Sequence, residues 1–529
     1  MGQGASVTSP SRGGRLTRRA LLGAAALPLI GCGERAEVTG RFTGASPERG
    51  HVLRERRFDP PKGTPRKVDV VIAGGGVAGL AAARALRQRG IEDFALLEFE
   101  DAAGGNSRGG EIAGIACPLG AHYLPVPGDD ARDVQELLEE LGLRRRVAGR
   151  WTYDERHLCH APQERLYIEG QWQEGLLPLK GVGAGALAQY RRFASKVDEA
   201  GRAARFTIPA PRIVPPSHRA LDTLTFSQWL AREGFDDPHL RWYLDYCCRD
   251  DYGAGAQQVS AWAGIHYFAS RHGFQAPGAE TLEREPVLTW PEGNSWITTR
   301  LANDVGDRLR TGRVVLRVSE EREGVEIDAW NAATNTVERW QARHCIVALP
   351  AFIAARVVAQ PSNALRDRAA GTRYAPWAVV NLHLREQLRD RGGAPPSWDN
   401  VLYGSQGLGY VDARHQSLDP RPGPTVLSFY RAPGQAARAA LLSRGWASWR
   451  DEIVAEMAVP HPDLAEKLTR VEVARYGHAM ATPVPHTLSL PASHVARTRR
   501  LTFAHGDWAG YSIFEEAFGL GHRAALDVR

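Results

Sequence analysis

The stretch from residue 67 to residue 100, KVDVVIAGGGVAGLAAARALRQRGIEDFALLEFE, decides the fold. Residues 68–73 are an apolar run rich in β-branched side chains, which predicts a buried strand. Residues 80–89 are rich in alanine and other helix formers, which predicts a helix. The segment between them, GGGVAG at 74–79, carries the GxGxxG spacing. The stretch therefore predicts a strand, a tight turn and a helix of a doubly wound α/β domain.

The glycine motif has the spacing of a turn that binds a dinucleotide. Gly74 permits the tight turn, Gly76 lets the backbone approach a pyrophosphate, and Gly79 lets helix and strand pack closely. The first helical turn, which contains Ala78, offers free N–H groups and a partial positive charge to the phosphates. Glu98 lies 19 residues after Gly79, where a carboxylate can accept hydrogen bonds from ribose hydroxyls. An acid at this position argues against a 2′-phosphate.

The residues that follow Glu98 indicate which dinucleotide to expect. The segment EFEDAAGGNSRGG at 98–110 places Gly104, Gly105 and Arg108 at the E-x5-G-G-x-x-R spacing. This pattern resembles FAD enzymes of the flavin amine oxidase superfamily, which also holds protoporphyrinogen oxidases and carotenoid desaturases. The resemblance implies that the second glycine pair approaches the diphosphate and that Arg108 anchors it. PLGAHYL at 118–124 is similar to the segment that this family places beside the flavin.

The stretch RLTFAHGDWAGYSIFEEAFGLGHRAA at 500–525 is similar to the closing motif of the same family. In that motif an acid binds the ribityl chain, and the last helix points its N-terminus at the flavin, where its dipole stabilises negative charge. The chain departs from the pattern at His505, which replaces alanine, and at Glu516, which replaces glycine. The matching residues are Gly506, Asp507 and Ala517.

The segment GRVVLRVSEEREGVEIDAW at 312–330 resembles the middle FAD segment of the family, and Val315 is expected to contact adenine through its backbone. The resemblance implies an α/β fold in which a Rossmann-type FAD-binding domain, of the kind found in amine oxidases, is interleaved with an α+β substrate domain. We expect the FAD-binding domain over 67–150, 285–350 and 485–529, and the substrate domain over 151–284 and 351–484.

The substrate half gives weaker indications. APWAVVNLHL at 375–384 resembles the strand on which amine oxidases carry a lysine that assists the reaction of reduced flavin with oxygen, yet no lysine lies between residues 197 and 466. Asn381 is the best candidate for the substituted position, and the missing lysine favours an acceptor other than oxygen, such as a quinone. Trp508 and Tyr511 are candidates for an aromatic wall over the flavin. No catalytic acid or base can be assigned.

Composition excludes several classes of function. The net charge of +6 is spread along the chain, so nucleic-acid binding is not expected.

The cysteines after Cys32 show no CxxC spacing and are expected to be buried thiols. HLCH at 157–160 lacks a second group of ligands, so no metal is expected. No cysteine follows Cys345, which predicts that FAD is bound non-covalently. The oligomeric state stays open.

The sequence therefore predicts an FAD-dependent oxidoreductase that takes a hydride from a C–N bond of a small amine-like molecule. Two alternatives remain open. One is a C–C desaturase or protoporphyrinogen-oxidase-like dehydrogenase with a quinone acceptor. The other is a flavoprotein without catalytic activity.

The N-terminal stretch LTRRALLGAAALPLIGCGE at 16–34 predicts an export signal over 1–31. Its apolar run is about half of the ~20 residues that span a bilayer, and Arg18 and Arg19 resemble a twin-arginine signal, whose transporter accepts folded proteins. The alternative is a Sec signal. LIGC resembles a lipobox, which implies a lipid on Cys32 and a periplasmic or cell-envelope lipoprotein anchored in a membrane. Residues 32–66, rich in Gly, Pro and charge, are expected to be an unstructured tether.

Overall fold

The computed structural model describes residues 37–61, 63–278, 286–419 and 421–528. The predicted signal segment and Cys32 lie outside these residues, so the predictions made for them stay predictions. Across the described ranges, no helix combines the length and the apolar character that a bilayer span needs.

The predicted strand, turn and helix are present. β2 (Arg66–Ala73) leads through the glycine turn into α2 (Val77–Gln88), and β3 (Phe94–Leu97) follows. β2 and β3 pair in parallel, with Val70 opposite Phe94, because the helix between them returns the chain to the same end of the sheet.

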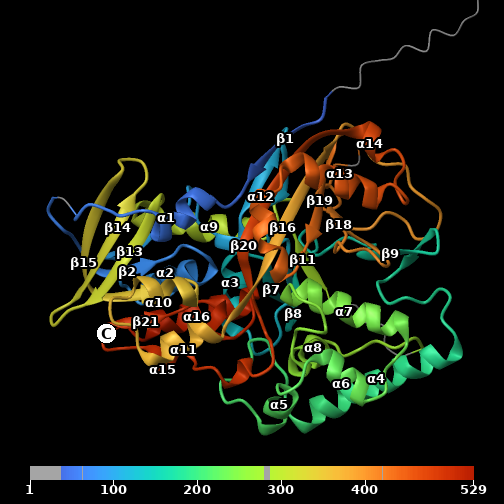
Figure 1. The fold of residues 1–529 in the computed structure, drawn as a ribbon, viewed down its shortest axis with the longest axis horizontal. Helices are drawn as coiled ribbons and strands as arrows, with labels where there is room; N and C mark the ends of the chain where they lie inside the picture. Colours follow the sequence, from blue (N-terminus) through green and yellow to red (C-terminus); the bar gives the residue numbers. More distant parts are fainter. Residues whose placement is uncertain (1–36, 62, 279–285, 420, 529) are drawn as a thin grey trace, which may run out of the picture. The chain divides into compact units, whose positions relative to one another are not determined.

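This unit belongs to a seven-stranded sheet, on the left in Figure 1. β2 and β15 pair in parallel, and β21 pairs in parallel with the last residues of β15. The strand order is β12-β3-β2-β15-β14-β13, and β21 lies beside β15 off this path. The remaining bounds are β12 (Leu309–Arg310), β13 (Arg313–Glu320), β14 (Val325–Asn331), β15 (Thr336–Val347) and β21 (Leu501–Phe503).

Helices cover both faces of this sheet because successive strand residues point to opposite sides. Val70 and Ile72 pack in one core with α2, and Val71 and Ala73 pack in another. The first core also contains residues of α3 (Arg132–Glu140), α9 (Ser295–Val305) and α16 (Phe514–Leu526). The second contains residues of α10 (Ala351–Val357), α11 (Asn363–Gly371) and α15 (Ser493–Ala496). Residues of α10 and α11, which follow the predicted boundary at residue 350, thus pack on the sheet that contains β2.

The second sheet has eight strands, in the order β1-β20-β16-β19-β18-β17-β9-β10. Except for β1, all of them come from the segments predicted to form the substrate domain. Their bounds are β1 (Thr39–Thr43), β9 (Glu164–Ile168), β10 (Gln171–Glu174), β16 (Arg373–Leu384), β17 (Asp399–Leu402), β18 (Tyr410–Asp412), β19 (Thr425–Arg431) and β20 (Leu468–Thr482).

Two groups of helices pack against this second sheet. α13 (Trp446–Met457) buries Trp449 and Ile453 against β16 and β20, and α12 (Arg438–Ser443) and α14 (Leu464–Lys467) flank it. The other group, coloured green in Figure 1, forms a helical layer with its own aromatic core. It consists of α4 (Ala184–Ala203), α5 (Pro216–Leu221), α6 (Phe226–Arg232), α7 (Pro238–Tyr252) and α8 (Ala261–Ala269).

Three two-stranded sheets complete the fold of the described residues. They are β4 (Gly109–Ile112) with β5 (Ile115–Pro118), β7 (Arg144–Val147) with β8 (Arg150–Tyr153), and β6 (Tyr123–Pro125) with β11 (Val287–Thr289).

The prediction of an unstructured tether over 32–66 is wrong for much of its length. β1 adds a parallel strand to the edge of the second sheet, with Thr39 opposite Arg470. α1 (Pro47–Glu55) follows, capped by the Ser46 side chain, which accepts a hydrogen bond from the Arg49 N–H at 3.2 Å. The segment is too polar to fold alone, but pairing with β20 satisfies its backbone groups.

Candidate active site

The glycine turn between β2 and α2 is built from close backbone contacts. A Cβ on Gly79 would lie 1.9 Å from the carbonyl oxygen of Gly74, and a Cβ on Gly74 would lie 2.4 Å from that of Ala348. Gly74 also has a φ of +104°, which L side chains rarely adopt. Neither position can therefore carry a side chain unless the backbone moves.

The second glycine pair, predicted separately, lies against the first. The Gly104 N–H donates to the Gly75 carbonyl oxygen at 2.8 Å. A Cβ on Gly105 would lie 3.1 Å from the Cα of Gly76, whereas a Cβ on Gly76 would meet only the Gly105 Cα, at 3.9 Å, among the described atoms. The two turns thus form a cradle of bare backbone with room for a pyrophosphate beside Gly76.

Glu98 and Arg108 flank this cradle. The buried Glu98 carboxylate accepts hydrogen bonds from the N–H groups of Gly75, at 2.7 Å, and Glu100, at 2.8 Å. Burial raises the pKa of Glu98. Arg108 donates from Nε to the Gly105 carbonyl at 3.2 Å, and its guanidinium lies 3.7 Å from the Glu100 carboxylate. A positive charge thus stands beside the second glycine turn, where a diphosphate would need it.

Val315 lies in β13, close to Glu98. The N–H of Arg313, two residues earlier, donates to the Glu98 carbonyl oxygen at 2.8 Å. Val315 is the last residue before a bulge in the pairing of β13 with β14, and its side chain is buried. Its predicted backbone contact with adenine stays a prediction.

Asp507 follows β21 and is buried. Its Oδ2 accepts hydrogen bonds from the Ala351 N–H at 2.8 Å and the Tyr374 hydroxyl at 2.5 Å. Burial alone would raise the pKa of Asp507, but His505 and these two donors outweigh it, so that the pKa is lowered. Oδ1 lies 3.0 Å from Nδ1 of His505. Nδ1 of His505 accepts a hydrogen bond from the Asp507 N–H at 3.2 Å, so it does not donate to Oδ1. Oδ1 of Asp507 therefore has no donor among the described residues, and a ribityl hydroxyl would supply one.

The helix α16 begins seven residues after Asp507 and contains Ala517 in its first turns. A Cβ on Gly521 would lie 2.0 Å from the carbonyl oxygen of Ala78, so α16 packs directly on α2. Glu516, which stands where the family has glycine, forms two hydrogen bonds. It accepts hydrogen bonds from the Ala210 N–H at 2.6 Å and the Tyr511 hydroxyl at 2.8 Å, and it ties α16 to the loop before α5.

The two predicted wall residues, Trp508 and Tyr511, lie in different cores. Trp508 packs against Phe503, with ring centroids 5.6 Å apart, in the core of the first sheet. Tyr511 packs against Trp262, with centroids 5.9 Å apart, in the helical layer. The two rings therefore pack in separate cores, and their predicted place over the flavin stays a prediction.

Asn381 lies fully buried on β16. Its Nδ2 donates to the Pro118 carbonyl oxygen at 2.9 Å, and its Oδ1 accepts from the Ser428 hydroxyl at 2.5 Å. It thus ties the centre of the second sheet to the segment 118–124. Its role as the substituted lysine position stays a prediction.

The segment 118–124 links the cradle to a cavity. The Ala121 N–H donates to the Asn106 carbonyl oxygen at 2.8 Å, directly after the second glycine pair. His122 then faces the cavity and stacks on Tyr430, with ring centroids 4.3 Å apart. Burial lowers the pKa of His122 to about 3, so that its imidazole is neutral.

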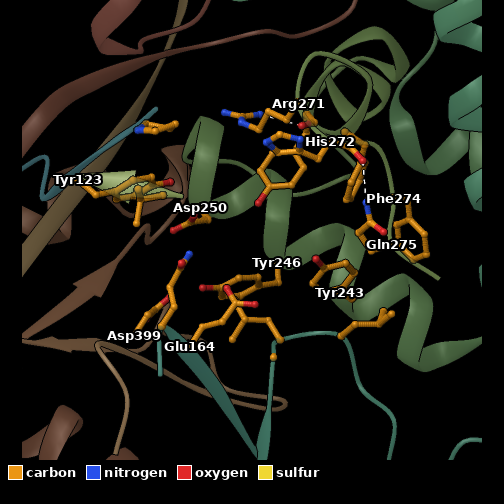
Figure 2. Close-up of a pocket in the computed structure, with 18 of the residues that line it drawn as sticks. Tyr123, Glu164, Tyr243, Tyr246, Asp250, Arg271, His272, Phe274, Gln275 and Asp399 are labelled. Atoms are coloured by element: carbon orange, nitrogen blue, oxygen red, sulfur yellow. Dashed lines mark hydrogen bonds between the residues drawn. The ribbon is translucent and has the colours of Figure 1, made fainter. Parts of the chain in front are cut away.

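The cavity has a volume of about 820 Å³ and lies between the helical layer and the strands β9 and β17 (Figure 2). Its wall combines aromatic rings with carboxylates. The aromatic residues are Tyr123, Tyr243, Tyr246, Tyr267, Phe268, Phe274, Trp398 and Tyr430, and the acids include Glu164, Asp250 and Asp399. Sequence reasoning missed these acids. The stretch 397–417, which contains β17 and β18, contributes Trp398, Asp399 and Leu408 to the wall.

The predicted buried thiols are present. Cys117, Cys247, Cys248 and Cys345 are buried and free, and Cys159 is half-buried. His157, in the HLCH stretch, accepts a hydrogen bond at Nδ1 from the Trp290 indole at 2.9 Å. Throughout the part of the chain that the structure describes, no group of three or more His, Cys, Asp or Glu side chains is arranged to hold a metal ion.

Comparison with known proteins agrees with this arrangement. The family model of flavin containing amine oxidoreductases matches residues 77–528. The chain belongs to this family. Membership implies a flavin cofactor, and the family and the mixed α/β fold are those predicted.

Individual relatives are distant. The chain is 24% identical over 302 residues to a probable flavin-containing monoamine oxidase A of Dictyostelium discoideum, covering 56% of this chain and 60% of the relative. It is 22% identical over 325 residues to human amine oxidase B, covering 59% of this chain and 56% of the relative. The matches thus span little more than half the length of these two relatives.

Solved structures of the family share the fold. A putrescine oxidase bound to putrescine superposes with a TM-score of 0.66 at 19% identity, covering 88% of this chain and 99% of the other. Cyclohexylamine oxidase from Brevibacterium oxydans gives a TM-score of 0.62 at 18% identity, covering 87% and 98%.

Proposed function

We propose that this member of the flavin amine oxidoreductase family takes a hydride from a C–N bond of a small amine-like substrate. The observation that supports the proposal is the cavity described above. Its wall is continuous with the cofactor cradle through residues 118–124, and its carboxylates suit an amine. Carboxylates in the cavity wall disfavour the C–C desaturase alternative, because an apolar substrate would displace water from them without replacing its hydrogen bonds.

The residues of the chain have separate tasks in this function. The two glycine turns and Arg108 hold the diphosphate of FAD, Glu98 accepts from the ribose, and Asp507 accepts from the ribityl chain. When bound, FAD supplies the hydride acceptor, so that no side-chain base is obligatory. The neutral imidazole of His122 adds no positive charge to the cofactor end of the cavity, where the reacting nitrogen must be uncharged to lose hydride from its neighbouring carbon.

FAD is held non-covalently, and its electrons pass to an acceptor other than oxygen, such as a quinone. The first statement rests on the absence of cysteine after Cys345, and the second on the absence of lysine between residues 197 and 466. Acid precipitation should release all flavin into the supernatant. Under single-turnover conditions, the reduced protein should be reoxidised faster by a soluble quinone than by oxygen; the reverse order would refute the lysine argument.

The chain is exported and anchored by a lipid on Cys32. This proposal rests on the stretch 16–34 alone. Replacing Arg18 and Arg19 together by lysine should retain the protein in the cytoplasm, and Cys32→Ser should abolish labelling with radioactive palmitate. Labelling of the serine variant, or normal export of the lysine variant, would contradict the proposal.

The decisive experiment on the activity is anaerobic. Purified protein with bound flavin is mixed with a panel of aliphatic amines, aromatic amines and polyenes, and the absorbance of the oxidised flavin is followed. Bleaching by amines is expected. Bleaching by polyenes alone would favour the desaturase alternative, and no bleaching by any compound would favour a flavoprotein without catalytic activity.

A further inference from the structure

The N-terminal arm, residues 39–55, lies outside the range that matches the family model, which begins at residue 77. The arm consists of β1, the short turn after it and α1, and it runs from the second sheet to the first (Figure 1). β1 pairs with β20 along its whole length. None of the side chains of α1 is buried, so specific polar contacts determine where this helix lies.

The start of α1 contacts the segment that follows β3. The Ser46 N–H donates to the Glu100 carboxylate at 2.8 Å. Glu100 is only 5% exposed and lies 3.7 Å from the guanidinium of Arg108. Arg49 donates to the carbonyl oxygen of Phe99 at 3.2 Å. The arm is therefore tied to the strand end that carries the predicted ribose-binding acid and, through Glu100, to the arginine predicted to anchor the diphosphate.

The end of α1 contacts a different part of the cofactor site. The carbonyl oxygen of Leu53 accepts a hydrogen bond from Nε of Arg356, on α10, at 3.1 Å. The Leu53 side chain packs against the core that contains Val315, the residue predicted to contact adenine. α10 begins at Ala351, whose N–H donates to Asp507. α1 is thus joined to the helix that helps to fix the predicted ribityl-binding acid.

The strand order places these two sets of contacts on either side of the glycine turn. β3 and β15 are the neighbours of β2 in the first sheet, and the glycine turn follows the carboxyl end of β2. α1 contacts the segment after β3 and the helix after β15. Ligands of doubly wound sheets bind at the carboxyl ends of the strands. The arm therefore joins the two flanks of the cofactor site to each other and, through β1, to the second sheet.

We propose that the N-terminal arm retains FAD, because it holds the two flanks of the site together and must open before FAD can leave. Arg49 and Arg356 are positioning residues, since each fixes the arm and neither is assigned a contact with FAD. A segment with few buried apolar contacts suits an element that opens locally while the rest of the fold stays intact. This inference rests on the flavin that family membership implies and goes beyond the proposed amine oxidation.

The test measures how fast bound FAD exchanges. Protein loaded with radioactive FAD is mixed with an excess of unlabelled FAD, and the radioactivity that stays bound is counted at successive times. Arg49→Ala should exchange FAD about three- to tenfold faster than the natural protein, the effect expected for one partly exposed hydrogen bond from a charged group. Arg356→Ala should act in the same direction.

Arg54→Ala is the matched control. Arg54 lies in the same helix, but its side chain is exposed and, among the described residues, pairs only with Glu55 of that helix. The FAD exchange rate of this variant should equal that of the natural protein.

Hydrogen exchange supplies a readout that does not depend on turnover. The amides of residues 46–55 should exchange more slowly with FAD bound than in flavin-free protein, because cofactor binding and arm closure are linked. In flavin-loaded Arg49→Ala the same amides should exchange faster than in the natural protein. Those of α4, in the helical layer, should be unchanged, which separates opening of the arm from general destabilisation.

The outcomes separate this inference from the proposed function. Natural rates of FAD exchange in both Arg49→Ala and Arg356→Ala, or an equal acceleration in Arg54→Ala, would overturn the inference and leave amine oxidation standing. Amide exchange of residues 46–55 that is the same with and without FAD would also overturn it. Failure of every amine to bleach the flavin would refute the proposed function alone, since retention of FAD by the arm does not depend on the substrate.

Discussion

The hydroxyl of Tyr374 orients the carboxylate that is predicted to hold the ribityl chain. Tyr374 is buried and donates to Oδ2 of Asp507 at 2.5 Å. Tyr374→Phe would leave a buried carboxylate short of one donor. We expect the free energy of unfolding to fall by about 1–3 kcal/mol and the FAD content of the purified protein to fall with it.

Chemical denaturation and the flavin-to-protein absorbance ratio measure these two effects. Tyr403→Phe is the control, because the half-buried Tyr403 hydroxyl has no hydrogen-bond partner among the described residues. Full flavin content in Tyr374→Phe would contradict the assigned role of Asp507.

Gly79 makes the most restrictive contact in the glycine turn. Gly79→Ala would bring a Cβ to within 1.9 Å of a backbone oxygen, so α2 must move away from β2. We expect loss of bound FAD and a lower melting temperature. Gly201→Ala is the control, since a Cβ there meets nothing within 4 Å in α4 and should stabilise the helix by about 0.5–1 kcal/mol. Retention of FAD by Gly79→Ala would show that the turn is not the cofactor cradle.

At the scale of elements, β1 and α1 join the folded body although their sequence is polar. Phe42 packs against the core of β16 and β20, and the guanidinium of Arg475 lies 3.5 Å from its ring centroid. Phe42→Ala should lower the free energy of unfolding by about 1–2 kcal/mol, the range expected for a half-buried aromatic ring with a cation–π contact.

Limited proteolysis tests the same element more directly. Residues 38–55 should resist cleavage in the natural protein and become sensitive in Phe42→Ala. Ile213→Ala, at a side chain that is 87% exposed, should leave the pattern unchanged. Rapid cleavage of this segment in the natural protein would restore the tether interpretation.

At the scale of the whole molecule, the carboxylates of the cavity couple stability to pH. The pKa of Asp250 is raised from 3.8 to about 7, so the folded state binds more protons than the unfolded state between about pH 4 and pH 7. Stability should therefore fall as pH rises through this window. Asp250→Asn should be more stable than the natural protein at pH 8, by at least about 1 kcal/mol, and the difference should shrink towards pH 5.

Thermal unfolding of both proteins from pH 5 to pH 8 measures this effect. Asp236→Asn serves as control and should follow the natural protein, because Asp236 is exposed, accepts a hydrogen bond from Gln189 and does not line the cavity. A gain in stability that does not depend on pH would exclude the protonation argument for Asp250.

Sequence motifs indicate residues for the cofactor half of the candidate site but none of the acids that line the cavity, for a physical reason. The glycine turns, Glu98 and Arg108 lie within 35 residues, and backbone geometry fixes which residue types can stand at each position. Asp250, Asp399 and Glu164 lie on three elements that are far apart in the sequence. Each of them alone resembles an ordinary acid in a helix or at the start of a strand. Only the tertiary fold brings them together.

Long-range packing also determines the position of side chains and strands that the local sequence does not indicate. Trp508 and Tyr511 are close in sequence, yet the turn between them sends them into separate cores. β1 forms because β20 offers an open edge, which its own sequence does not reveal. The Ser46-Pro47 pair is a helix-start signal that could have indicated α1.

The pairing of β15 also has a consequence for biosynthesis. On one side β15 pairs with β2, which is made early, and its last residues pair with β21, which is made more than four hundred residues later. A chain emerging from the ribosome therefore exposes the apolar end of β15, and lacks Asp507, until the segment from 501 onward has been translated. Such long-range pairing is slow and leaves partly folded chains prone to aggregation. Capture of FAD should accordingly be one of the last events of maturation, and a bound flavin would report that the early and late strands of the sheet have met.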